Sequence, residues 1–140
     1  MKKKFILFIA VIFTLAMVSS AYAGKCPQPR KTKSAPPSIS KKDNTKKANK
    51  ANGEKLYQKK AKPMACKMCH GAKGGGDGKL GKALKPSPRD FTCKKTMKKV
   101  SAGQMYWIIK NGSKGTGMAP MKLKDKEIWD VIKYIREDLM

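Results

Sequence analysis

The sequence predicts an all-α domain in which helices and long loops surround a bound group. No stretch alternates apolar and polar residues with the period of two that marks a half-buried strand. Apolar residues instead recur at helical spacing in three segments, near residues 51–61, 101–111 and 125–139. The Gly-, Pro- and Lys-rich segments between these helices are long, and three short helices bury little surface by themselves. We therefore expect something other than side chains to fill part of the core.

Composition limits the kinds of site that the chain can hold. The 140 residues include 33 Lys and Arg against 9 Asp and Glu, a formal net charge of +24, and a single His. One imidazole excludes sites that need two from the same chain, such as a two-His zinc finger, an HExxH metalloprotease or a bis-His haem. The length is that of one domain.

Residues 1–23 have the layout of a secretory signal peptide. Three lysines precede an apolar run from Phe5 to Val18, and the segment ends in an A-x-A pattern at Ala23. The apolar run is shorter than the ~20 residues that span a bilayer. We expect export to the periplasm with cleavage after Ala23, and an uncleaved membrane anchor is the alternative. In an exported protein the positive charge indicates acidic partner proteins or an anionic membrane surface, and not nucleic acid.

Residues 24–50 are expected to form a disordered basic leader. They contain four prolines and nine Lys or Arg residues, and Ile39 is their only large aliphatic side chain. Such a segment cannot bury enough apolar surface to offset the entropy lost on ordering. The ordered domain is therefore predicted to cover residues 51–140.

Three helices are expected in the ordered domain. The first covers about residues 51–61 and is stopped by Pro63. The second covers about residues 101–111, between an N-cap serine and a terminating glycine. The third, about 125–139, is the clearest, because five aliphatic side chains lie at helical spacing along it: Ile128, Val131, Ile132, Ile135 and Leu139.

The chemistry of the chain is indicated by Cys66-Lys67-Met68-Cys69-His70, which follows the first helix. C-x-x-C-H is the attachment signature of c-type haem. Residues i, i+3 and i+4 fall on one face of a helical turn. The two thiols can thus reach the two haem vinyl groups while the imidazole points at the iron. We expect one haem c, bound covalently through Cys66 and Cys69, with His70 as an iron ligand.

Two other uses of a C-x-x-C pair fit the sequence less well. A zinc site needs further ligands, but Cys26 and Cys93 form no second close pair and there is no other His. A thioredoxin-like redox pair belongs to a βαβ pattern, which is missing here.

An iron held by one His has either a second axial ligand or an open site. In the absence of a second imidazole, methionine sulfur is the expected donor, and this ligation raises the haem potential. Met118 and Met121 lie in the Gly/Pro-rich loop 115–121 between the second and third helices. This loop is able to wrap over the far haem face, and the alternative for either methionine is plain packing against the ring.

Residues of about 51–140 resemble a class I cytochrome c of the small monohaem bacterial periplasmic type. Gly53 and Tyr57 resemble the glycine and aromatic residue of that family's first helix, which crosses the last helix. Tyr134 resembles the aromatic residue of the last helix. The resemblance implies the cytochrome c fold, with three main helices and long loops wrapped around one covalently attached haem.

The resemblance also extends to the iron ligands. Residues 117–120 are similar to the family's distal methionine loop, which implies that Met118 is the second axial ligand, with Met121 as the runner-up. The family has a proline whose carbonyl accepts a hydrogen bond from the proximal imidazole, and Pro86 and Pro88 are the candidates.

The remaining cysteines, Cys26 and Cys93, form either a disulfide that ties the leader to the domain or two free thiols.

Two filled axial positions predict an electron carrier and not an enzyme, because the iron then has no open site for a substrate. We expect a monomeric periplasmic one-electron carrier, with lysines that steer it to acidic redox partners in small, transient contacts. The alternative is a haem-based ligand-binding or sensor module, in which neither Met118 nor Met121 binds the iron.

Overall fold

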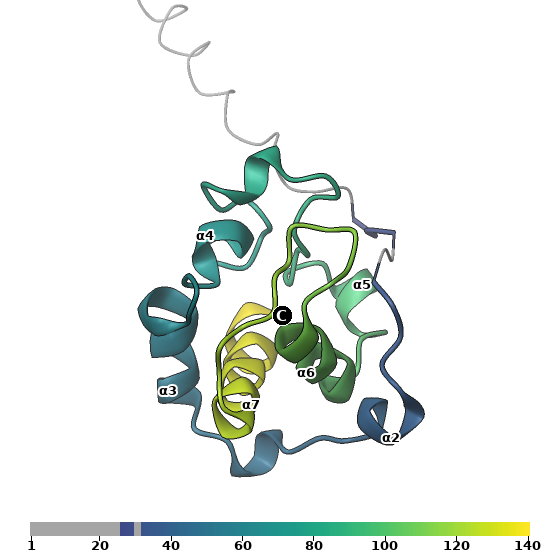
Figure 1. The fold of residues 1–140 in the computed structure, drawn as a ribbon, viewed down its shortest axis with the longest axis vertical. Coiled ribbons are helices and arrows are strands. Elements are labelled where there is room, and N and C mark those ends of the chain that lie inside the picture. The colour runs from purple at the N-terminus through teal and green to yellow at the C-terminus, as the bar shows by residue number, and fades with distance from the viewer. Residues whose placement is uncertain (1–25, 30–31) are drawn as a thin grey trace, which may run out of the picture.

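The computed structural model of the chain describes residues 26–29 and 32–140. The regular structure of this part of the chain is helical throughout, as Figure 1 shows. The principal helices are α3 (Lys50–Lys55), α6 (Ala102–Asn111) and α7 (Asp125–Tyr134). Two π-helical turns, η2 (Leu56–Lys60) and η4 (Ile135–Leu139), prolong α3 and α7. The predicted all-α class is confirmed, and the three helices lie where the apolar spacing predicted them.

Shorter elements and loops connect these helices. They are α2 (Pro37–Ser40), η1 (Thr45–Lys47), α4 (Lys67–His70), η3 (Gly81–Ala83) and α5 (Lys94–Met97). None of the helices in the described ranges has the length and apolar character needed to span a bilayer. The signal peptide expected at residues 1–23 lies outside the described residues.

The first principal helix crosses the last one at Gly53. A Cβ atom at this position would overlap the backbone oxygen of Asp130 on α7, so the close approach of the two helices requires a glycine. The buried Asp130 carboxylate accepts hydrogen bonds from the Asn49 backbone N–H at 2.6 Å and from Asn52 Nδ2 at 2.8 Å. The crossing is therefore fixed by both shape and hydrogen bonding.

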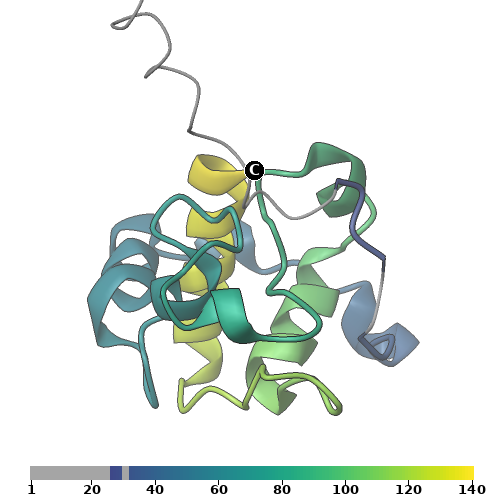
Figure 2. The same cartoon turned by 90° about the horizontal axis from the view of Figure 1, so that it is seen from above.

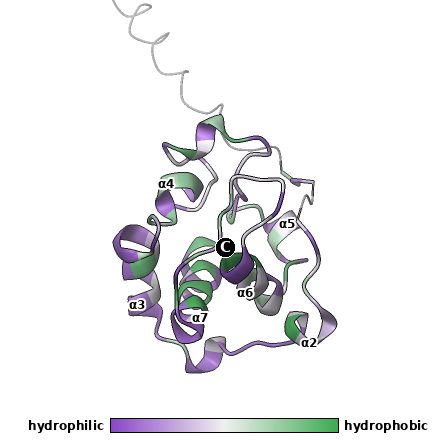
Figure 3. Ribbon diagram, in the orientation of Figure 1, coloured by the Kyte–Doolittle hydropathy of each residue, from purple (hydrophilic) through white to green (hydrophobic). Residues whose placement is uncertain are grey.

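The core lies where α6 and α7 meet, with α7 between α3 and α6 in both views (Figures 1 and 2). Ile128 and Ile132 of α7 are completely buried, and Tyr106 of α6 stacks on Trp129 with ring centroids 4.8 Å apart. Figure 3 shows hydrophobic and hydrophilic positions interleaved along α7, as expected of a helix with one buried face. Ser101 caps α6 by accepting the Gln104 N–H at 3.1 Å.

The described part of the leader is ordered, which corrects the prediction of a disordered segment at 24–50. Helix α2 packs beside α6, Ala35 is buried and Ile39 packs against the core. Gln104 of α6 accepts the Ala35 N–H at 2.7 Å and donates to the Lys33 carbonyl at 3.0 Å. The leader is thus held by hydrogen bonds from the domain, and its own low apolar content does not have to supply the ordering energy.

A disulfide between Cys26 and Cys93 provides a further attachment of the leader. Of the two alternatives for these cysteines, the structure therefore has the disulfide. Cys93 is 3% exposed and stands immediately before α5, so this covalent link ends inside the domain and not on its surface.

Candidate haem site

The C-x-x-C-H sequence forms a single helical turn at α4. The His70 N–H donates to the Cys66 carbonyl at 2.9 Å, so these two residues lie one turn apart on the same helical face. Gly71 ends the turn with φ of 80°, a conformation that favours glycine. Tyr57, which is fully buried, donates its hydroxyl to the Gly71 carbonyl at 2.7 Å. The first helix therefore holds the end of the turn in place.

Both thiols of the turn are free in the structure. Burial raises the pKa of the Cys66 thiol to about 12, and burial also raises the pKa of Cys69. Redox-catalytic C-x-x-C pairs have the opposite property, a lowered thiol pKa that supplies a thiolate. No group of three or more His, Cys, Asp or Glu side chains suited to a metal ion occurs in the described ranges, so the zinc interpretation finds no ligand set there.

The His70 imidazole is held on one side by a backbone carbonyl. Its Nδ1 lies 3.0 Å from the Arg89 oxygen, and the ring stacks on Phe91 with centroids 4.6 Å apart. A carbonyl oxygen can only accept, so Nδ1 carries the proton and the Nε2 lone pair is left for another partner. Burial lowers the pKa of His70, which favours this neutral form.

The acceptor is Arg89, which corrects the expectation that Pro86 or Pro88 would take this role. Arg89 follows Pro88 directly, and the adjoining Phe91 N–H donates to the Gly74 carbonyl at 2.7 Å. The glycine-rich loop after the haem motif therefore positions the segment 88–91 under the imidazole. The sequence could not indicate which residue accepts this hydrogen bond, because every residue has a backbone oxygen.

The loop after α6 contains both candidate methionines. It turns back at Gly112, whose φ is 70°, and the Ser113 N–H donates to the Met118 carbonyl at 2.8 Å. The Met121 N–H donates to the Ile109 carbonyl at 2.9 Å. Both methionine side chains are partly buried and pack against the hydrophobic core. The sequence-predicted distal residues thus lie on one loop that is folded against the end of α6.

A buried hydroxyl on this loop has no partner. Ser113 is 7% exposed, and its Oγ is the one buried side-chain oxygen or nitrogen among the described residues without a hydrogen bond. Such an atom is costly unless another group satisfies it. The donor set therefore fits a haem c: two thiols, an imidazole with a free Nε2, thioether sulfurs and an unsatisfied hydroxyl for a polar substituent.

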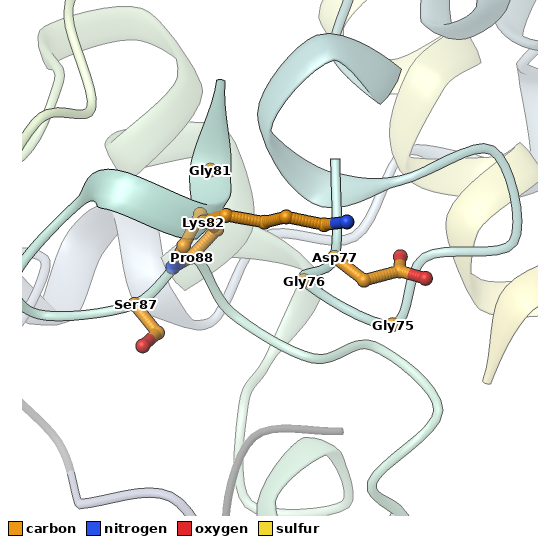
Figure 4. Close-up of a pocket in the computed structure, with 7 residues that line it drawn as sticks. All are labelled: Gly75, Gly76, Asp77, Gly81, Lys82, Ser87 and Pro88. Carbon is orange, nitrogen blue, oxygen red and sulfur yellow. The ribbon is translucent and has the colours of Figure 1, made fainter. Parts of the chain in front are cut away.

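A small pocket beside the proximal segment does not fit a macrocycle. Its volume is about 60 Å³. It is bordered by Asp77, Lys82, Ser87 and Pro88 and by the loop glycines (Figure 4). This volume suits a few water molecules.

Exposed lysines lie along the segments that make up the site: Lys73, Lys79, Lys85, Lys114 and Lys122. The ion pairs Lys50–Asp138 (2.9 Å) and Lys110–Asp125 (2.8 Å) are formed by the principal helices and by η4, and not by these segments. The segments of the site therefore carry more positive than negative side chains.

Comparisons with known proteins identify a family and a structural neighbour. The family model for cytochrome c matches residues 50–137. One chain of the reducing HAO-like protein complex of Kuenenia stuttgartiensis is similar in structure, with a TM-score of 0.51 and 25% sequence identity. The similarity covers 64% of this chain and 43% of that chain, so it spans less than half of the neighbour's length. The comparison with curated proteins found no match.

The matched range contains the three principal helices, the C-x-x-C-H turn and the methionine loop. Domains of this kind bind haem c covalently and use it to transfer electrons. The chain belongs to the cytochrome c family.

Proposed function

We propose that the protein is a periplasmic monohaem electron carrier with His70 and Met118 as the axial ligands. The observation that carries the proposal is the His70 ring, whose Nδ1–H is bound by the Arg89 carbonyl at 3.0 Å. This bond fixes the tautomer and leaves Nε2 available to iron. Phe91 stacks on the ring and limits its rotation.

The proposed attachment residues are Cys66 and Cys69, each forming a thioether with one haem vinyl group. When bound, the haem supplies a one-electron couple between ferric and ferrous iron. The chain supplies the axial ligands, the apolar surroundings and the partnerless Ser113 hydroxyl. Two axial ligands from the protein leave no coordination position for a substrate, so we propose a carrier and not an enzyme.

Export is proposed from residues 1–23 and is supported by the Cys26–Cys93 disulfide. Disulfides persist in oxidising compartments such as the bacterial periplasm and are rare in the cytosol. The proposed location is therefore the periplasm.

The proposed partners are redox proteins with acidic docking surfaces. We propose that this chain binds them as a monomer. A net charge of +24 and the lysines along the site favour steering towards such surfaces. The structural neighbour belongs to a reducing HAO-like protein complex, which supports a redox protein as the partner. The rate of electron transfer is expected to fall as ionic strength rises, and a salt-independent rate would contradict the steering.

The decisive test compares two methionine variants three residues apart in one loop. Met118→Ala should open the ferrous haem to carbon monoxide and lower the reduction potential on the order of 0.1 V, within the ~0.8 V range that axial ligands control. Met121→Ala is the matched control and should leave both properties unchanged. The opposite pattern would make Met121 the ligand. Rapid carbon monoxide binding by the unaltered protein would favour a ligand-binding or sensor module.

A further inference from the structure

The Gln28 side chain, in the leader, forms hydrogen bonds to the backbone segment whose carbonyl binds the proximal histidine. Its Oε1 accepts the Asp90 N–H at 2.8 Å, and its Nε2 donates to the Pro88 carbonyl at 3.1 Å. The Arg89 guanidinium approaches the same side chain, with Nη1 at 3.4 Å from Oε1. One leader side chain is thus bound on both sides of Arg89.

The Asp90 N–H and the Arg89 carbonyl belong to one peptide unit. This unit is planar, and its N–H and C=O point in opposite directions. Fixing the N–H with Gln28 therefore also fixes the direction of the carbonyl that accepts from His70 Nδ1 at 3.0 Å. Hydrogen bonds in series also polarise one another, so the bond at the N–H strengthens the carbonyl as an acceptor.

The leader is tethered so that Gln28 stays in this position. Cys26 is joined to Cys93 by the disulfide, and the Gln28 N–H donates to Thr96 Oγ1 at 3.0 Å. Asp90 is 4% exposed, so in the folded chain Gln28 and not water is the partner of its N–H.

We propose that Gln28 is a positioning residue for the axial histidine, acting through the Arg89–Asp90 peptide and held there by the Cys26–Cys93 disulfide. The leader then tunes the electron donation of the imidazole to the haem iron, because the carbonyl bond at Nδ1 makes the ligand more basic. This inference rests on the proposed function, in which His70 binds the iron.

The test uses the haem-loaded full chain and the Gln28→Ala variant. Exchange of the His70 Nδ1–H with deuterated water, followed by NMR in the ferrous state, should become about tenfold faster, the factor expected for one weakened hydrogen bond. The potential should rise, because a less basic imidazole stabilises ferric iron less. We expect about a threefold higher ferrous-to-ferric ratio at a fixed applied potential.

Gln104→Ala is the matched control. This glutamine also binds the leader, through hydrogen bonds to Ala35 and Lys33 that lie away from the Arg89–Asp90 peptide. It should leave the exchange rate and the potential at their original values. Gln28→Glu, which keeps an acceptor for the Asp90 N–H, should restore most of the original exchange rate.

The double variant Cys26→Ser/Cys93→Ser removes the tether without touching Gln28 and should give an intermediate effect in the same directions. If Gln28→Ala does not fold, this double variant still tests the proposal. Unaltered exchange and potential in both variants would overturn the inference, and so would an equal effect of Gln104→Ala.

Failure of the proposed function is seen separately, in the unaltered protein. A spectrum without low-spin, six-coordinate haem there would remove His70 as an axial ligand and would overturn both proposals. A low-spin spectrum with an unresponsive Gln28→Ala variant would overturn only the role of Gln28.

Discussion

Two helix crossings in this molecule each require a glycine, but they hold different parts of the fold together. At one, Gly53 of α3 meets the backbone of α7 at Asp130; at the other, Gly103 of α6 meets the backbone of α2 at Ile39. A buried polar side chain secures each crossing, the Asp130 carboxylate in the first and the Gln104 amide in the second. The first joins the two ends of the haem domain, whereas the second only attaches the leader. We therefore expect global effects from the first and local ones from the second.

The largest effect is expected from Gly53→Ala. The added Cβ would overlap the Asp130 backbone oxygen, which cannot move without displacing α7. Overpacking costs about 1–3 kcal/mol, and a clash with backbone places this variant at the upper end of that range, about 3 kcal/mol. At roughly 4–8 °C per kcal/mol for a small domain, the melting temperature of the haem-loaded protein should fall by more than about 12 °C. A melting temperature close to that of the original protein would show that the crossing can relax.

Removing the charge at the same crossing should have the next largest effect. Asp130→Asn keeps the volume but presents an NH2 group to one of the two donors at Asn49 and Asn52. Losing a hydrogen bond to a buried charged group costs about 1.5–3 kcal/mol. Denaturant unfolding monitored by far-UV circular dichroism measures this loss. An unchanged midpoint would mean that water satisfies the donor.

Gly103→Ala tests the leader crossing and should act locally. Its Cβ would overlap the Ile39 carbonyl, so α2 should detach while α3, α6 and α7 remain packed. Trypsin should then cut at the leader lysines several-fold faster, with little change in the melting temperature.

The control for the added methyl group is Gly115→Ala. No atom lies within 4 Å of a Cβ there, and only the backbone φ of 80° is unfavourable, at about 1–2 kcal/mol. This variant should leave leader cleavage unchanged. A large global destabilisation by Gly103→Ala would remove the distinction between the two crossings.

The smallest effect is expected when the pH is lowered. Asp43 in the leader accepts the Thr45 N–H at 3.0 Å and the Thr45 hydroxyl at 2.6 Å, and these bonds lower the pKa of its carboxyl, the hydroxyl bond most. A lowered pKa means that the stabilisation is present above the unfolded value, near 3.8, and is lost as pH falls through the folded value. An NMR titration of the Thr45 amide should show this transition below pH 3.8. A midpoint above that pH would contradict the stabilising role.

The domain was more predictable than the leader for a physical reason. Helical periodicity records which side chains face a core, so the three principal helices could be placed from the sequence. The turn at residues 66–70 is local, and its residue types and spacing indicate haem directly. The order of the leader depends on partners far away in the sequence, such as Gln104 for Ala35. The amino-acid composition of the leader does not indicate these contacts.

The second limit of the sequence concerns backbone groups. The carbonyl that binds His70 belongs to Arg89, a residue whose side chain suggests nothing of the kind. Only the path of the chain after Pro88 decides which oxygen faces the imidazole.

The Cys26–Cys93 bond also divides the molecule into a ring and a tail. The ring is closed by two cysteines that lie 67 positions apart in the sequence. It contains the haem motif and the Arg89 carbonyl, whereas Met118 lies on the open tail. In a denatured chain the two sides of the haem therefore differ in freedom: the proximal half remains circular and the distal half is released. Closing a ring of this size removes denatured-state entropy worth about 4 kcal/mol in the chain-entropy model. Refolding of an oxidised chain would then start with its proximal half already closed into a ring, and α6, the methionine loop and α7 would still have to pack against it.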